Sequence, residues 1–141
     1  MKKLLGLYLL FSLSAFSSEV KDFNLTTYKD KKEFKLKDHL GKKTIVLNFW
    51  ASWCTSCITE LPELHALKKK YPKALFIGIN SGESEKFVKK FLRRYKFNYK
   101  ILMDKTKTVA KSYGIDTLPR TIVIGMDKKI SFKGDRPPSK I

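Results

Sequence analysis

The chain has 141 residues, 43% of them hydrophobic, so it can bury one hydrophobic core but is too short for two. Its formal net charge is +17, from 30 Lys and Arg against 13 Asp and Glu. The cations are spread along the whole chain without aromatic clusters or a nucleic-acid-binding motif, which excludes nucleic acid as the expected partner. A solvated basic surface of this kind also allows peripheral contact with anionic lipid or acidic proteins.

The N-terminus has the layout of a secretory signal. Two lysines precede an apolar run over residues 4–16, and polar sequence follows. The alternative, an uncleaved membrane anchor, needs about 20 apolar residues, more than this run provides. We predict a signal peptide at residues 1–17 and one exported domain at residues 18–141. The expected location is the periplasm or another extracytoplasmic compartment, with the chain membrane-anchored if the signal is retained.

The next segments have the patterns of β-strands. Residues 23–28 and 33–36 are short strand-like pieces separated by a turn, and they predict a hairpin. Residues 44–50 are nearly all β-branched, aromatic or aliphatic, which predicts a strand buried on both faces at the centre of a sheet. Residues 74–80 predict a second buried strand.

Helical periodicity follows both of these buried strands. Apolar residues recur at helical spacing from Ile58 to Leu67, and Pro62 inside this helix predicts a kink. A second helix is expected to open at Ser84. Its predicted apolar face consists of Phe87, Val88, Phe91, Leu92 and Tyr95.

The remaining pattern alternates strand and helix. We expect a strand at residues 100–104, a short helix at 106–113 stopped by Gly114, a strand at 117–125 entered through a proline, and a last strand at 130–133. This order predicts an α/β fold in which a central mixed β-sheet is flanked by helices on both faces.

Cys54 and Cys57 are the only cysteines in the sequence. A disulfide between them closes almost no loop and would add little stability. They follow the predicted central strand and open the predicted helix, where unpaired backbone N–H groups and the helix dipole favour a thiolate. We therefore expect Cys54 to be the exposed attacking thiolate and Cys57 to resolve the mixed disulfide.

A Cys-x-x-Cys pair can also attach haem or bind a metal ion. Haem attachment requires a His after the second Cys, where this chain has Ile58. A zinc site needs two more ligands, and His39 and His65 have no paired spacing, so we place both at surface or helix-face positions. Two thiolates alone can hold Cu(I), so a copper carrier remains an alternative. We expect no resident metal and no cofactor.

Two segments carry a family resemblance. The sequence Asn-Phe-Trp-Ala-Ser-Trp-Cys-Thr-Ser-Cys at residues 48–57, together with Leu-Pro-Arg-Thr at 118–121, resembles the TlpA/ResA branch of bacterial extracytoplasmic thioredoxin-like proteins, which is related to the redoxin and AhpC/TSA proteins. The resemblance covers residues 23–133. It implies a thioredoxin-like fold and thiol–disulfide oxidoreductase activity.

The resemblance also implies roles for individual residues. Pro119 is expected in the cis form facing the sulfurs, leaving the backbone of Leu118 free to pair with a substrate, and Trp53 is expected beside the same substrate surface. Glu60 matches a glutamate able to accept or return a proton during exchange. Many thioredoxins carry a buried Asp where this chain has Asn48, which cannot titrate, so Glu60 is the better candidate for proton transfer.

Some features depart from the common family pattern. Ser56 replaces a frequent Pro, and Arg120 places a cation after the proline, where it could favour a thiolate or draw acidic partners. The ending at residues 134–141 contains two prolines and cannot form the usual C-terminal helix. We therefore expect that helix to be lacking and one sheet face to be short of cover.

The resemblance suggests a reductant kept reduced by a membrane thiol reductase. Its substrates would be exported proteins with oxidised Cys pairs, for example apocytochromes during cytochrome c maturation. The residues themselves leave the direction open, because Cys-x-x-Cys proteins span a wide range of potentials. A redoxin-type thiol peroxidase is a further alternative, but it would need Thr or Ser where Ala51 stands, three residues before Cys54.

Overall fold

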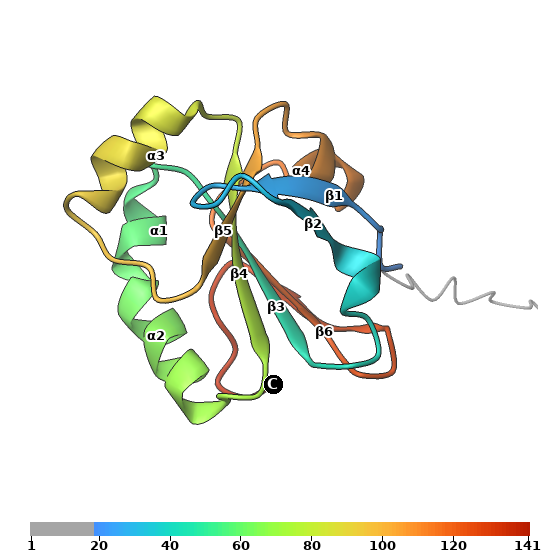
Figure 1. Cartoon of the computed structure of the whole chain (residues 1–141). Helices are drawn as coiled ribbons and strands as arrows, with labels where there is room; N and C mark the ends of the chain where they lie inside the picture. Colours follow the sequence, from blue (N-terminus) through green and yellow to red (C-terminus); the bar gives the residue numbers. More distant parts are fainter. Residues whose placement is uncertain (1–18) are drawn as a thin grey trace, which may run out of the picture.

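The computed structural model describes residues 19–141, and the predicted signal peptide at residues 1–17 lies outside them (Figure 1). The strands of this part are β1 (Asn24–Thr27), β2 (Glu33–Lys35), β3 (Ile45–Trp50), β4 (Leu75–Ser81), β5 (Lys100–Asp104), β6 (Arg120–Ile124) and β7 (Ile130–Gly134). The helices are α1 (Thr55–Thr59), α2 (Leu61–Lys70), α3 (Glu85–Leu92) and α4 (Thr108–Ser112), with a short 3₁₀ turn at Leu36–Asp38.

The strands form one mixed sheet in the order β2-β1-β5-β4-β3-β6-β7. β3 lies parallel to β4 and antiparallel to β6, and all of its residues are buried. A strand covered on both faces can be built entirely from apolar and aromatic side chains, which explains its sequence. The prediction of a central buried strand is confirmed.

The N-terminal hairpin is also confirmed. β1 and β2 pair antiparallel, with Leu25 opposite Phe34. β1 then joins the sheet through the pairs Thr26–Met103 and Thr27–Leu102 on β5. The hairpin therefore extends one edge of the sheet.

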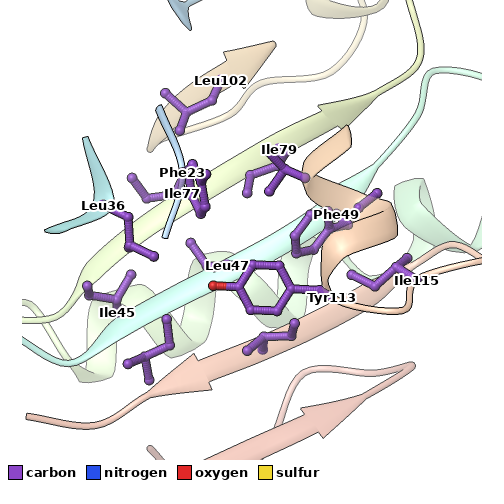
Figure 2. Packing of buried hydrophobic residues seen from close by; sticks show 14 of the residues in the cluster. Phe23, Leu36, Ile45, Leu47, Phe49, Ile77, Ile79, Leu102, Tyr113 and Ile115 are labelled. Atoms are coloured by element: carbon purple, nitrogen blue, oxygen red, sulfur yellow. The ribbon is translucent and has the colours of Figure 1, made fainter. Parts of the chain in front are cut away.

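The face of the sheet that carries α4 is largely apolar. Ile45, Leu47 and Phe49 alternate along β3 toward this face, where they meet Tyr113 after α4 and Leu102 from β5 (Figure 2). Phe34 and Leu36 from the hairpin region pack into the same cluster. Most of these side chains have no exposed surface, so their burial is a large part of what stabilises the fold.

The opposite face carries α1, α2 and α3, which confirms helices on both faces (Figure 1). Trp50, at the end of β3, lies here with its ring centroid 4.8 Å from that of Phe91 on α3 and 4.7 Å from that of Phe97. Val46 packs against Leu67 of α2 on the same face. Consecutive residues of β3 thus serve two different layers.

The predicted kink is a break between α1 and α2. Glu60 is both the C-cap of α1 and the N-cap of α2, and Pro62 occupies the first turn of α2. A proline is tolerated there because the first turn has no intrahelical partner for its missing N–H. The break sets the angle between the cysteine-bearing turn and the rest of the helix.

Two details of the later helices differ from the predictions. Phe87 was expected on the apolar face of α3 but is 53% exposed, because only Val88 and Phe91 are directed fully into the core. α4 begins at Thr108, later than expected, because Lys107 has a left-handed backbone with φ 60°. The Asp104 carboxylate accepts hydrogen bonds from the N–H groups of Val109 and Ala110 and so caps this helix.

Within residues 19–141 no helix follows β7, as predicted, but the expected lack of cover is only partly correct. The extended tail at residues 135–141 runs back beside α2 (Figure 1). The side chain of Ile141 packs with the cluster that contains Val46 and Leu67, and Lys70 donates a hydrogen bond of 3.4 Å to the carbonyl of Ser139. The tail therefore covers part of the face that a terminal helix would occupy.

Candidate active site

Cys54 and Cys57 lie where the central strand passes into α1. β3 ends at Trp50, and Cys54 is the N-cap of α1, with its Sγ accepting a hydrogen bond of 3.2 Å from the backbone N–H of Cys57. The two sulfurs form a disulfide, and the Cα atoms are 5.3 Å apart. The predicted position of the attacking sulfur at a helix N-terminus is confirmed.

The predicted exposure of Cys54 is wrong for this disulfide form. Cys54 is 5% exposed and Cys57 4%, because both belong to the apolar cluster formed with Trp50, Leu61 and α3 residues. Trp53, by contrast, is 67% exposed immediately before Cys54. The exposed side chain at this point is therefore that of Trp53, with both cysteines buried beside it.

Glu60 is buried at the break between α1 and α2, with 4% of its surface exposed. Its Oε1 accepts a hydrogen bond of 2.7 Å from Nδ2 of Asn48, and the same Nδ2 lies 3.3 Å from Oγ1 of Thr121 on β6. Burial raises the pKa of Glu60 to about 7, while the Asn48 hydrogen bond acts in the opposite direction. Near neutral pH this carboxyl can therefore both accept and return a proton.

A pocket of about 410 Å³ opens between α1, the loop before β6 and the C-terminal tail. Ser56 and Glu60 line one side, and Leu118 and Pro119 line the other. The Leu118–Pro119 peptide bond is cis, as the resemblance implied. Leu118 also packs against the cluster that holds both cysteines, which places this loop against the sulfur-bearing turn.

The backbone next to Pro119 is open for pairing. β6 begins at Arg120, and no strand of residues 19–141 pairs with Leu118. The guanidinium of Arg120 donates a hydrogen bond of 3.2 Å to Oγ1 of Thr117, and Arg136 and Asp135 of the tail complete the pocket wall. The tail thus contributes two charged residues to the candidate site.

Glu83 is a site residue that the sequence analysis missed. Its buried carboxylate accepts hydrogen bonds from the backbone N–H of Ser52 at 2.8 Å, from Oγ of Ser52 at 2.5 Å and from Nδ2 of Asn80 at 2.7 Å. These bonds fix the loop that carries Trp53 and Cys54. The sequence feature that could have indicated it is an acidic residue just after β4. The carboxyl end of β4 lies beside that of β3, after which the cysteines follow.

The two histidines take packing positions. His39 stacks on Phe34 with ring centroids 4.8 Å apart, and His65 meets the ring of Tyr99 edge-on at 6.0 Å. Burial lowers the pKa of each. Burial therefore favours the neutral form of both imidazoles.

The arrangement combines a dithiol–disulfide pair with a titratable carboxyl and an open backbone edge. A disulfide in this position can accept two electrons from a thiolate partner and become a dithiol, and the dithiol can return them to another disulfide. Each direction moves protons on or off sulfur, and Glu60 is the buried group with a pKa suited to that transfer.

The sequence pattern of the AhpC/TSA family matches residues 17–133. The chain belongs to the AhpC/TSA family. Thiol-disulfide oxidoreductase ResA of Bacillus thuringiensis subsp. konkukian is 32% identical to it over 127 residues, which cover 87% of this chain and 72% of that relative. ResA of Geobacillus thermodenitrificans is 33% identical over 118 residues, covering 82% and 67%.

Solved structures agree on the architecture of this AhpC/TSA family member. A secreted Mycobacterium tuberculosis disulfide oxidoreductase homologous to E. coli DsbE superimposes with a TM-score of 0.72 at 24% identity, covering 84% of this chain and 87% of that one. The fold is therefore thioredoxin-like, as predicted. With the ResA relatives and the Cys54–Cys57 disulfide, this family member is a thiol–disulfide oxidoreductase.

Among residues 19–141, no helix has both the length and the apolar character that spanning a membrane requires.

Proposed function

We propose that the protein reduces disulfides in exported proteins, with Cys54 as the attacking sulfur and Cys57 as the resolving sulfur. The observation that carries this proposal is the buried Glu60, with a pKa near 7, three residues after Cys57 and lining the pocket beside the cysteine-bearing turn. A resolving thiol must lose its proton before it attacks, so a neighbouring base is most useful when the protein acts as a reductant.

The proposed reaction has two steps. The Cys54 thiolate attacks one sulfur of the partner's disulfide, which breaks that bond, forms a mixed disulfide and releases the other partner sulfur as a thiolate. Glu60 then accepts the proton of Cys57, whose sulfur attacks Sγ of Cys54 and releases the second partner sulfur as a thiolate. The two partner thiolates take up one proton from Glu60 and one from water, which gives the dithiol. Two electrons pass to the partner, and the protein is left with the Cys54–Cys57 disulfide.

The surroundings of the pair supply substrate contacts in this proposal. The exposed Trp53 and the Leu118–Pro119 loop form two sides of the approach to the sulfurs, and the unpaired backbone before β6 receives an extended partner segment. Pro119 has no N–H and so cannot donate a hydrogen bond to the sulfurs. The backbone contact requires no particular partner sequence.

We also propose the cellular setting. Export through the signal-like residues 1–17 places the domain outside the cytoplasm, where partner cysteines become oxidised. A membrane thiol reductase then returns the protein to the dithiol form, and apocytochromes awaiting haem are one class of substrate. The relatives named ResA and the structure homologous to DsbE are compatible with this setting.

Trapping of the mixed disulfide tests the proposal. The Cys57→Ser variant, expressed in the source cell, is expected to accumulate disulfide-linked adducts through Cys54, and mass spectrometry would identify the partners. The Cys54→Ser/Cys57→Ser double variant is the matched control and should yield none. In cells without the protein, the trapped partners should accumulate with their cysteines oxidised.

Two results would contradict this function. Partners that accumulate as free thiols in those cells would show that the protein oxidises them. An absence of adducts, together with tight one-to-one Cu(I) binding or rapid thiol-dependent peroxide consumption, would move the assignment to the copper-carrier or peroxidase alternative.

A further inference from the structure

The outer face of α3 and the turn after it carry a dense run of cations. Residues 86–103 contain seven cations and no acidic residue. Six of them follow one another along α3 and the turn after it. We call these six the α3 basic surface: Lys86, Lys89, Lys90, Arg93, Arg94 and Lys96.

The cations of the α3 basic surface have no acidic partners. All six residues are exposed, and within residues 19–141 no carboxylate lies within 4.0 Å of any of their charged groups. Residues 1–18 contain no Asp or Glu. The nearest acid in sequence, Glu85, is already shared by Lys31 and Lys105. The positive potential of this surface is therefore not neutralised within the chain.

An aromatic side chain lies among these charges. Phe87 is 53% exposed, and helical spacing places Lys90, three residues further on, on the same side of α3. A large apolar side chain exposed in a field of unpaired cations has no role in the folded core. With its cations and the exposed Phe87, α3 has the composition of interfacial helices that insert an aromatic ring between lipid head groups.

A groove continues the same surface toward the hairpin. It has a volume of about 1030 Å³, with Tyr28, Leu92 and Phe97 among its apolar lining and Lys89 and Arg93 on its rim. Its one acidic residue, Asp30, is hydrogen-bonded by the hydroxyl of Thr27. An apolar lining with a cationic rim matches an amphipathic anion, which has an apolar body and a negative head.

We propose that the α3 basic surface docks on an anionic phospholipid bilayer. A lipid surface is favoured over an acidic protein because the charges lie along a convex helix, where a delocalised negative surface meets them all at once. Phe87 then inserts beside the head groups, and the groove accommodates part of a lipid.

Docking in this orientation would hold the redox pair near the membrane. The inner face of α3, through Val88 and Phe91, packs in the same cluster as Cys54 and Cys57. The pair therefore lies about one helix diameter, roughly 10 Å, from the docked surface. This consequence rests on the proposed function, because it brings the disulfide close to a membrane donor, but the docking itself does not depend on it.

Vesicle binding by the full chain provides the test. The test variant is Lys86→Gln/Lys89→Gln/Lys90→Gln/Arg93→Gln, and the control removes the same charge elsewhere, as Lys43→Gln/Lys73→Gln/Lys111→Gln/Lys129→Gln. Flotation with phosphatidylglycerol-containing vesicles measures docking. Pure phosphatidylcholine vesicles measure what the apolar N-terminal run contributes by itself.

We expect the test variant to lose about tenfold or more of its affinity for the anionic vesicles, the control to lose about threefold or less, and phosphatidylcholine binding to stay equal. Phe87→Ser is expected to weaken anionic binding severalfold with the charges intact. Equal losses in test and control variants, or no preference for anionic vesicles, would overturn the proposal and leave an acidic protein as the partner to seek. Disulfide reduction in solution should be unchanged in the test variant, so a failure of docking is distinguishable from a failure of the proposed function.

Discussion

The two faces of the sheet use alternate residues of one strand for opposite purposes. On the α4 face, Leu47 and Phe49 pack among aliphatic and aromatic side chains and have no exposed surface (Figure 2). On the other face, Asn48 between them reaches Glu60, a buried carboxyl beside the cysteine-bearing turn. The first face is mainly a stabilising core, whereas the second also holds a buried carboxyl that costs stability and that, in the proposed function, accepts the proton of Cys57.

This contrast predicts that activity and stability separate cleanly by face. The largest expected effect is that of Cys54→Ser, which should lower disulfide reduction by at least about a thousandfold because it removes the nucleophile. In the reduced state the free energy of unfolding should change by less than about 0.5 kcal/mol, because Ser is nearly isosteric. A coupled reductase assay and urea unfolding under reducing conditions measure the two effects. Residual activity within tenfold of the wild type would remove Cys54 from its proposed role.

The α4 face should respond in the opposite way. Phe49→Ala is expected to lower the free energy of unfolding by about 3–5 kcal/mol because it leaves a cavity in a closely packed cluster. Phe87→Ala removes the same kind of ring from an exposed position and should change the free energy of unfolding by less than about 0.5 kcal/mol. Urea titration of both variants checks the pair, and similar losses for the two would contradict the packing described for Phe49.

The loss of stability caused by burying Glu60 should depend on pH. The pKa of Glu60 is about 7 in the folded protein and near its ordinary value of 4.5 in the unfolded chain. Below pH 4.5 both states are protonated and the cost is absent. Between pH 4.5 and 7 the unfolded state ionises first, so stability falls with rising pH and levels off above 7.

The variant Glu60→Gln removes this dependence. At pH 8 it should be more stable than the wild type by up to about 3 kcal/mol, and at pH 4 the two should be equal. Thermal unfolding of the disulfide forms across this range measures the difference. The exposed Glu63→Gln change is the matched control and should leave the pH dependence in place. A constant offset between wild type and Glu60→Gln would show that Glu60 does not titrate as described.

The smallest predicted effect concerns the loop that presents the cysteines. Glu83→Gln replaces one carboxylate oxygen that accepts hydrogen bonds from Ser52 and should lower the free energy of unfolding by about 1–2 kcal/mol. It should also slow disulfide reduction severalfold, because the Trp53–Cys54 segment is held less firmly. Turnover and urea unfolding test both effects. Unchanged kinetics with normal stability loss would limit Glu83 to a structural role.

The sequence predicted those parts of the fold that depend on local pattern. The apolar run of β3 indicated a central strand, Pro62 indicated the break before α2, and Gly114, with φ 66°, ends α4 as expected. Each of these features follows from propensity or periodicity within a few residues. The cis bond before Pro119 came instead from the family resemblance.

The site features that escaped prediction depend on contacts between distant residues. Glu83 is 31 residues from its partner Ser52, and only the parallel pairing of β3 with β4 brings them together. The burial of Cys54 results from packing by α3, and the cover given by the tail requires contact between Ile141 and α2. Periodicity placed Phe87 on the apolar face of α3, but its burial depends on whether another part of the chain packs against it, which a local pattern does not show.

In the proposed mechanism, Glu60 is the base for disulfide exchange at the Cys54–Cys57 pair. The most direct test of this role is the rate of reduction of a small disulfide by the reduced protein between pH 5 and 9, taken as the ratio of wild type to Glu60→Gln so that the ionisation of Cys54 cancels. We expect a ratio near one at pH 5 that rises to about tenfold or more above pH 8, with a midpoint near pH 7. A ratio that stays constant across this range would contradict it.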